Sequence, residues 1–249
     1  MNNKRKLVAA LACRAASARL YAKPLQNLDK DTMVIEHLLS SMKDRHPAIN
    51  QIVLGISEGI ENQPFIQLAQ SSKIPHIIGD QKDVLSRLIA CGKLEDATDV
   101  FRVTSECPFI AWEYFDDVWN EHIKNDNDVT VLDHVPHGMH FEIYKISALE
   151  KSHAKGNDSE RSEYCSLYVR NNINEFKVAV IKPAQKYRRP DIRVTIDYPE
   201  DLIVCRKIYD EYKNKKIELN CEGIVSFLDH NSDLKNLNGV YASDVFLWS

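Results

Sequence analysis

Residues 7–25 read LVAALACRAASARLYAKPL and join an apolar run to a cationic loop. The run 7–13 has the length and composition of a buried β-strand. Four residues with phosphate-binding chemistry follow it: Arg14, Ser17, Arg19 and Lys23. Loops that leave the carboxyl ends of strands bind ligands in open α/β sheets, and arginine and lysine side chains suit a polyphosphate. The alternative interpretation is a solvated basic loop.

Further along the chain, short apolar runs alternate with segments of helical periodicity. Strands are expected at 51–56, 74–78, 100–104, 129–132, 140–144, 178–181 and 194–196, and helices from 31 or 32 to 43 and at 60–72, 81–91, 199–212 and 222–229. Such alternation is typical of βαβ units on a parallel sheet. The sequence therefore predicts an α/β fold with a mostly parallel central sheet.

Composition narrows the class of protein. The chain has 249 residues, 44% of them hydrophobic, and a net charge of −4. This charge gives no overall attraction to nucleic acid or to an anionic membrane, and no apolar run approaches the roughly 20 residues of a membrane span. No G-x-G-x-x-G motif follows any predicted strand, which argues against a dinucleotide-dependent dehydrogenase. The six scattered cysteines predict buried, reduced thiols, and we expect a cytoplasmic protein that binds neither nucleic acid nor membrane.

Two carboxylates stand just after predicted strands. Glu106 lies in RVTSECPF, and Asp197 lies in RVTIDYPEDL. Magnesium prefers hard oxygen ligands, often one or two carboxylates together with phosphate oxygens, so both residues are candidate metal ligands. Each could instead serve only at a helix N-terminus, through capping or through its charge.

Two other groups of polar residues have open interpretations. Asp83 and Arg87 are four residues apart on one predicted helix, where an ion pair is the alternative to a ligand-binding role. The histidines of H-x-x-H-x-x-H, residues 134, 137 and 140, have spacing that could suggest zinc, but Pro136 and Gly138 interrupt any helix there.

Several motifs together resemble one enzyme family. The pattern R-x-x-S-x-R-L-x-x-K-P-L is similar to the N-terminal signature of cytidylyltransferases that activate sugar acids, the CMP-KDO synthetase and acylneuraminate cytidylyltransferase group. The branch named after spore coat polysaccharide biosynthesis is the most similar. The segments G-D-x-x-D-V-L-x-R, R-x-T-S-E-x-P, P-x-G-x-x-x-E and R-x-T-x-D-x-P-E-D-L also resemble blocks of this family, so the resemblance spans nearly the whole chain.

The resemblance implies a three-layer Rossmann-like nucleotidyltransferase fold with a small inserted acceptor-binding subdomain. One domain would cover 1–249, with acceptor-binding and dimer contacts at about 129–190 and a helical extension at 215–249. The implied reaction couples CTP to an anionic, sugar-acid-like acceptor and releases pyrophosphate, for surface polysaccharide biosynthesis. A magnesium ion and a homodimer are implied as well.

The resemblance also assigns roles to residues. Arg14, Arg19 and Lys23 would act in catalysis on the triphosphate, while Glu106 and Asp197 would hold magnesium. The nucleotide would contact Ser17, Asp83, Arg87 and Ser105. The acceptor would contact His137, His140, Glu142, Arg161 and Arg193.

Departures from the family pattern leave one alternative open. Tyr21-Ala22 replaces a usual Pro-Gly, Ser105-Glu106 replaces Gly-Asp, and His137 and His140 stand where aspartates are usual. Imidazoles that can become cationic would favour an anionic acceptor. The longer Glu106 and the glycine-free loop also fit a nucleotide-binding protein that has lost turnover.

Overall fold

One mixed sheet forms the centre of the molecule. The structure is a computed structural model, and it describes residues 5–45, 48–243 and 245–248. The strand order is β3-β2-β1-β4-β6-β5-β7. The strands are β1 (Leu7–Cys13), β2 (Ile49–Ser57), β3 (His76–Gly79), β4 (Asp99–Arg102), β5 (Val129–Leu132), β6 (Phe141–Lys145) and β7 (Val178–Ile181). Strand β6 runs antiparallel to β4 and β5, and the other neighbouring pairs are parallel. The predicted fold class is confirmed.

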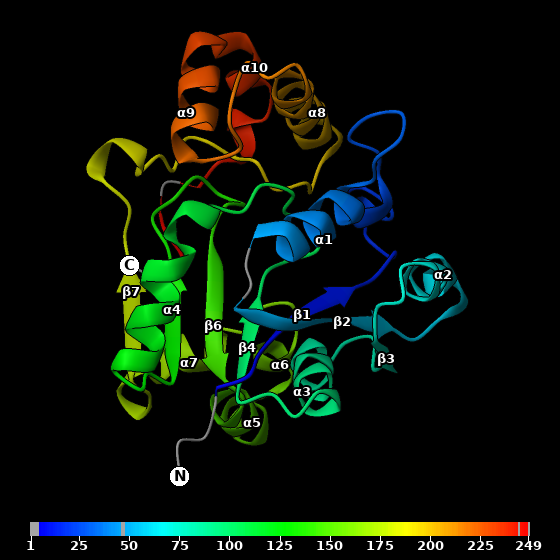
Figure 1. The fold of residues 1–249 in the computed structure, drawn as a ribbon, viewed down its shortest axis with the longest axis vertical. Coiled ribbons are helices and arrows are strands. Elements are labelled where there is room, and N and C mark those ends of the chain that lie inside the picture. Colours follow the sequence, from blue (N-terminus) through cyan, green and yellow to red (C-terminus); the bar gives the residue numbers. More distant parts are fainter. Residues whose placement is uncertain (1–4, 46–47, 244, 249) are drawn as a thin grey trace.

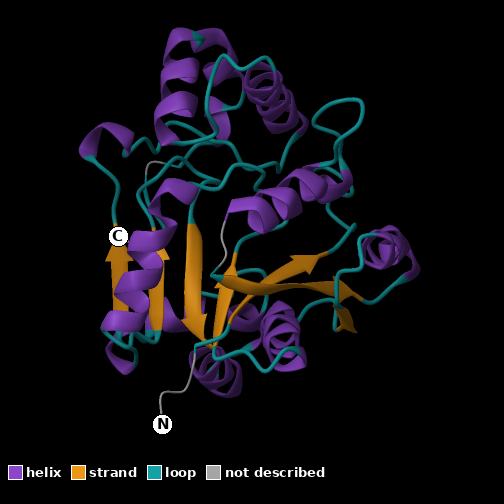
Figure 2. Cartoon of the chain, in the orientation of Figure 1, coloured by secondary structure: helices purple, strands orange, loops and turns teal. Residues whose placement is uncertain are grey.

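Helices cover both faces of the sheet (Figures 1 and 2). They are α1 (Val34–Arg45), α2 (Gln63–Ser71), α3 (Val84–Leu94), α4 (Phe115–Lys124), α5 (Ile146–Lys155), α6 (Asp158–Arg161), α7 (Leu167–Asn171), α8 (Pro199–Lys213), α9 (Cys221–His230) and α10 (Ser232–Leu237). None of these described helices is long and apolar enough to cross a membrane.

Strand β1 lies inside the sheet and feeds two hydrophobic cores. Alternate side chains point to opposite faces of a strand, so Leu7 and Leu11 join a core with α1, α2, α4, α8 and α9. Val8 and Ala10 join a second core with α3, α5 and α7. The continuous apolar run reflects this burial on both faces, and the three-layer arrangement follows from it. All six cysteines are buried and free, as expected.

Region 129–190 is built onto the central sheet. It supplies β5, β6 and β7, together with α5, α6 and α7. Helices α8, α9 and α10 gather at one end of the molecule (Figure 1).

Two predictions of local structure are wrong. Residues 194–196 form no strand: the isolated bridge to the loop around His137 stops at Arg193, and the backbone beyond it makes single hydrogen bonds, from Val194 to the His137 oxygen and from Ile196 to the Glu106 oxygen. Gly138 permits this close approach: a Cβ there would meet the Thr195 nitrogen at 2.4 Å. Helix α3 begins at Val84 and not at 81, because Asp80 accepts hydrogen bonds from the backbone of Lys82 and Asp83 and forms a turn. Helices α4 and α5 were not predicted.

Candidate functional site

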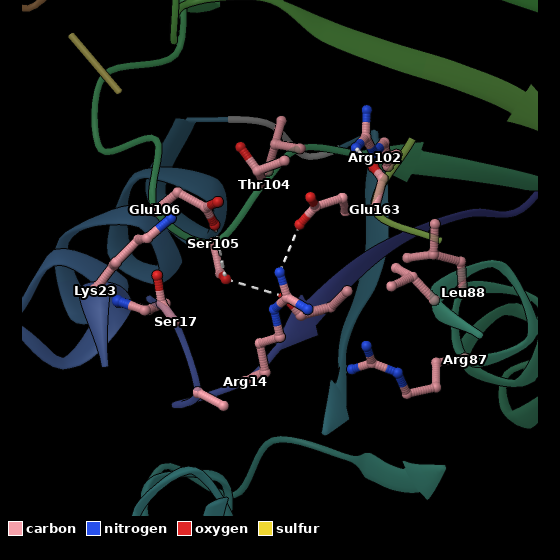
Figure 3. Close-up of a pocket in the computed structure, with 15 residues that line it drawn as sticks. Arg14, Ser17, Lys23, Arg87, Leu88, Arg102, Thr104, Ser105, Glu106 and Glu163 are labelled. Atoms are coloured by element: carbon pink, nitrogen blue, oxygen red, sulfur yellow. Dashed lines mark hydrogen bonds and ion pairs between the residues drawn. The ribbon is translucent and has the colours of Figure 1, made fainter. Parts of the chain in front are cut away.

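A pocket of about 620 Å³ lies where β1 and β4 end (Figure 3). Its walls come from the loop after β1, from η1 (Lys23–Leu25), from α3, from the segment after β4 and from the turn before α7. The polar lining residues are Arg14, Ser17, Lys23, Arg87, Arg102, Thr104, Ser105, Glu106 and Glu163. The pocket thus lies at the carboxyl edge of the sheet, as predicted for the cationic loop.

The cationic loop is held at both ends. Its first part is fixed by Asn62, whose Oδ1 accepts a hydrogen bond of 2.8 Å from the Ala15 nitrogen. The nitrogen of Ala22 donates to the Ala15 oxygen at 2.8 Å, which closes the loop. Ala22 has φ 49° and ψ 45°, a left-handed conformation that a glycine would adopt with less strain. The loop therefore keeps its closed shape without the glycine usual in the resembled family.

Lys23 and Arg19 both contact Asp197. The Nζ atom of Lys23 lies 2.6 Å from Asp197 Oδ1, and an Arg19 nitrogen lies 2.8 Å from the same oxygen. The Arg19 guanidinium also lies 5.2 Å from the centre of the Tyr198 ring, a cation–π contact. Tertiary structure thus joins the cationic loop to the second acidic segment. Arg14 instead forms an ion pair with Glu163.

Asp197 is also held by a buried cluster formed by Arg193 and Asp201. Arg193 forms ion pairs with Asp197 and with Asp201, and its Nε lies 2.9 Å from Asp201 Oδ1. Burial would raise the pKa of Asp197, but hydrogen bonds from Lys23 and Arg193 lower it below its ordinary value. Asp197 is therefore an anion. Arg193, which is 5% exposed, positions it and does not face an open acceptor site.

Glu106 is the second carboxylate of the site. It lines the pocket, and its backbone oxygen accepts a hydrogen bond of 3.1 Å from the Ile196 nitrogen, which ties the two acidic segments together. Burial raises the pKa of Glu106; the charge of Lys23 lowers it, and the negative charge of Asp197 raises it further. Ser105 donates to the Ala12 oxygen of β1 at 2.9 Å, so its hydroxyl fixes the segment.

These two carboxylates fit a magnesium ion. Within the described ranges, no group of three or more histidine, cysteine, aspartate or glutamate side chains is arranged around a metal position, and this includes the three spaced histidines. Magnesium needs fewer protein ligands than that, because phosphate oxygens and water complete its coordination. Burial is the main cause of the raised pKa of Glu106, and the negative charge of Asp197 adds to it. A bound divalent cation would offset both effects.

The structure separates Asp83 from Arg87. Asp83 caps α3 by accepting a hydrogen bond of 2.8 Å from the Ser86 nitrogen, and it lies 2.7 Å from His153 Nε2. Asp83 does not line the pocket, so its structural interpretation is the better supported one. Arg87 does line it, and donates to the oxygens of Cys13 and Gly55 at 3.2 and 2.7 Å.

A second pocket, of about 710 Å³, lies beside the predicted acceptor loop. It is lined by Asp133, Val135, His137, His140, Arg170, Pro190, Ser243, Val245, Phe246 and Leu247. Glu142 is 1% exposed and does not line it. Arg161 ends α6 and lines neither pocket. Of the predicted acceptor residues, His137 and His140 line this pocket, whereas Glu142, Arg161 and Arg193 do not.

The two imidazoles are neutral near pH 7, so the cationic form that the sequence interpretation considered for them is disfavoured in the fold. Burial lowers the pKa of His137 to about 4, with further contributions from His140 and Arg193. Burial likewise lowers the pKa of His140. The Nδ1 of His137 lies 3.0 Å from an Arg193 nitrogen. Because a guanidinium can only donate, this ring nitrogen is an unprotonated acceptor.

Arg102 and Glu163 are pocket residues that the sequence interpretation missed. Arg102 ends β4, every residue of which is buried, and pairs with Glu142 at 2.8 Å. A signal was present, because arginine is rarely buried at the end of an apolar strand unless it has a partner. Glu163 follows α6 in the sequence, and it reaches the pocket only through tertiary folding.

Comparison with known sequences gives a family and two relatives. The family described as cytidylyltransferase matches residues 8–244. An uncharacterized protein of Methanocaldococcus jannaschii is 28% identical over 235 residues, with 94% of each chain covered. The spore coat polysaccharide biosynthesis protein SpsF of Bacillus subtilis is 23% identical over 156 residues, which cover 62% of this chain and 65% of SpsF.

Solved structures show the same fold. A cytidylyltransferase from Leptospira borgpetersenii superimposes with a TM-score of 0.82 at 20% identity, over 92% of this chain and 96% of that one. A CMP:2-keto-3-deoxy-manno-octonic acid synthetase complexed with CTP superimposes with a TM-score of 0.64 at 13% identity, over 83% of this chain and 99% of the synthetase.

Proposed function

We propose that this chain, which belongs to the cytidylyltransferase family and is a nucleotidyltransferase, transfers CMP from CTP to a small anionic sugar acid. Pyrophosphate is the second product. The observation that carries this proposal is the contact of Lys23 with Asp197 across 174 positions of sequence. It brings a phosphate-binding cation and a candidate metal ligand together beside one pocket. The names of SpsF and of the CTP-bound synthetase support a role in supplying activated sugar for a surface polysaccharide.

Arg14, Arg19 and Lys23 supply the charge that the triphosphate needs. Phosphoryl-type transfer depends on positioning and on neutralising charge on phosphate oxygens. In this structure each of these cations is paired with a carboxylate, Arg14 with Glu163 and the other two with Asp197. Phosphate oxygens would replace these carboxylates as their partners. Ser17 lines the same wall and offers a hydroxyl, and Arg87 lines the opposite wall.

Glu106 and Asp197 would hold magnesium. When bound, the ion neutralises phosphate charge and polarises the phosphorus that is attacked. Lys23 forms an ion pair with Asp197 and keeps it ionised in the absence of the ion, and its charge also lowers the pKa of Glu106. Arg193 and Asp201 fix the backbone that carries Asp197, so its oxygens are already in place when the nucleotide arrives.

His137 and His140 would contact the acceptor as neutral hydrogen-bonding groups. Their pocket adjoins the loop that the resemblance assigns to acceptor binding. Assembly as a homodimer through region 129–190 is part of the same proposal.

The test is calorimetric titration with CTP, UTP, GTP and ATP, each with and without magnesium. The variants are Asp197→Asn and, as a matched control, Asp116→Asn on the exposed face of α4. We expect selective CTP binding that tightens at least tenfold with magnesium in the wild type and in the control. In Asp197→Asn the magnesium effect should vanish, while magnesium-free binding stays equal or becomes tighter because Lys23 and Arg19 lose a competing anion.

Two outcomes would contradict the proposal. Binding of CTP that ignores magnesium and Asp197 would favour a nucleotide-binding protein without turnover. No nucleotide binding by the wild type would remove the nucleotide half of the proposal altogether.

A further inference from the structure

Arg102 is fixed by the strand pairing itself. Its Cα lies opposite that of Glu142 in the antiparallel pair β4–β6. One guanidinium nitrogen, Nη1, donates to Glu142 Oε2 at 2.8 Å, and Nη2 lies 3.3 Å from the backbone oxygen of Glu163. Arg102 is 8% exposed, and the part of it that is accessible lines the first pocket beside Thr104 (Figure 3).

Glu142 is fully occupied by protein donors. Its Oε2 accepts from Arg102 and, at 3.0 Å, from the hydroxyl of Tyr144, while its Oε1 accepts from Trp248 Nε1 at 3.0 Å. Glu142 is 1% exposed and both of its oxygens accept hydrogen bonds from protein donors, so it is not open to an acceptor. Its role is therefore to hold the Arg102 guanidinium.

Trp248 reaches Glu142 across 106 positions of sequence. Its own nitrogen donates to Asp133 Oδ2 at 2.7 Å, and the preceding Leu247 oxygen accepts from Arg170 at 3.1 Å. Segment 245–248 is thus hydrogen-bonded on both sides of the second pocket. Trp248 is 9% exposed, and its indole N–H points to the carboxylate that orients Arg102.

Arg102 is separate from the cations expected to bind the β- and γ-phosphates. Arg14 and Lys23 come from the loop after β1, whereas Arg102 ends β4 next to β6. His140, which lines the second pocket, comes two residues before Glu142, the partner of Arg102 in the β4–β6 strand pair. Arg102 therefore lies between the pocket assigned to the nucleotide and the loop assigned to the acceptor.

We propose that Arg102 binds the anionic group of the acceptor, and that Trp248 is a positioning residue that acts through Glu142. The proposal rests on the function proposed above and adds the residue that recognises the acceptor's charge. One edge of a guanidinium can pair with Glu142 while other N–H groups receive a carboxylate or a phosphate. Both anions share this chemistry, so the test includes one arm for each.

The test compares the wild type with two variants. Trp248→Phe keeps an aromatic ring and removes the indole N–H, and Arg102→Lys keeps the positive charge and removes the forked guanidinium. Trp119→Phe is the matched control, because Trp119 is a partly buried residue of α4 outside both pockets. Pyrophosphate release is measured with CTP and magnesium and three probes: 2-keto-3-deoxy-manno-octonate, N-acetylneuraminate and glycerol 1-phosphate. Calorimetry with CTP alone is run on every variant.

We expect at least one probe to drive pyrophosphate release by the wild type. Trp248→Phe should raise the KM for that probe about tenfold, and Arg102→Lys should raise it further, since a hydrogen-bonded ion pair loses its geometry in both. In Trp248→Phe the KM for CTP and the CTP affinity should stay unchanged, and Trp119→Phe should behave as wild type. Whether a carboxylate or a phosphate probe responds identifies the acceptor's anion.

Several results would overturn this inference while leaving the proposed function intact. One is a probe KM that is unchanged in Trp248→Phe and Arg102→Lys. Another is a parallel loss of kcat and thermal stability in Trp248→Phe without a selective rise in KM, which would indicate a structural role. A wild type that binds CTP but responds to none of the probes would overturn the assignment of Arg102. Absence of CTP binding would instead refute the proposed function.

Discussion

At the scale of single residues, two buried arginines of one pocket differ in their partners. Arg87 is 1% exposed and donates only to backbone oxygens in the hydrogen bonds found for it. Its Nε is buried without a hydrogen-bond partner, and within the described residues it forms no ion pair. Burial lowers its pKa. Arg102, by contrast, is paired with Glu142. An unpaired buried cation costs stability, and this arrangement supports the nucleotide-binding role proposed for Arg87.

Substitution of each arginine by methionine should separate these roles. Arg87→Met should change the free energy of unfolding by less than about 1 kcal/mol, because a buried cation without a carboxylate is replaced by an apolar chain. The same variant should bind CTP at least tenfold more weakly. Arg102→Met should lower the free energy of unfolding by about 3–5 kcal/mol, because Glu142 remains buried without its partner. Urea denaturation measures both, and equal losses in the two variants would refute the distinction.

His137 gives a second prediction at this scale, on stability and pH. Its pKa is about 4 in the folded protein and 6.5 as the ordinary value, mainly because burial disfavours the cation. Between these values an unfolded-state His137 binds more protons than the folded-state one, so its contribution to stability falls as the pH is lowered from 6.5 to 4. The contribution of His137 is at most about 3 kcal/mol.

Denaturation midpoints measured between pH 4 and 7 test this contribution. His137→Asn keeps an acceptor for Arg193 and removes the titrating group, so its stability should depend less on pH in this window. A variant whose pH dependence equals that of the wild type would show that His137 is not the group responsible.

At the scale of elements, the start of α8 is organised by one buried carboxylate. Asp201 is fully buried and accepts hydrogen bonds from the nitrogens of Asp197 and Tyr198, at 2.8 and 2.9 Å. It also accepts from Arg193 and, at 2.8 Å, from Asn238. These bonds satisfy backbone donors that the helix itself leaves free. They explain why residues 194–196 are held in place without being a strand.

Removal of this carboxylate should therefore be costly. Asp201→Ala should lower the free energy of unfolding by about 3–5 kcal/mol, since Arg193 stays buried and loses a partner. Glu200→Ala, one position earlier in the same first turn, should cost less than about 1 kcal/mol, because only a favourable charge near the helix N-terminus is lost. Chemical denaturation of the two variants provides the comparison. A cost for Asp201→Ala as small as that of Glu200→Ala would mean that α8 and its preceding loop are held by other contacts.

At the scale of the whole molecule, topology assembles the site from distant segments. The sheet order places β1 between β2 and β4, so the loops after β1 and β4 open at the same edge. The segment before α8 then brings Asp197 to Lys23. The antiparallel β6 carries Glu142 to Arg102, which lines the first pocket, and the loop with His137 and His140 directly precedes β6. The function proposed above would use the first pocket for the nucleotide and this loop for the acceptor.

The sequence by itself determined the α/β class, the first strand and the cationic loop, because these depend on local apolar runs and on charges close together in the chain. It also indicated Glu106 and Asp197 as two candidate metal ligands that each follow a predicted strand. Only the tertiary structure decided which residues the candidate site residues contact. Asp83 caps helix α3, and Arg193 forms an ion pair with Asp197. Glu142 is buried and is bound by Arg102 and Trp248. The pairing of Glu142 with Arg102 and Trp248 joins residues that are 40 and 106 positions apart in the sequence. Burial then sets the charge of a group, as it does in making His137 neutral. Neither effect leaves a periodic signal in the chain.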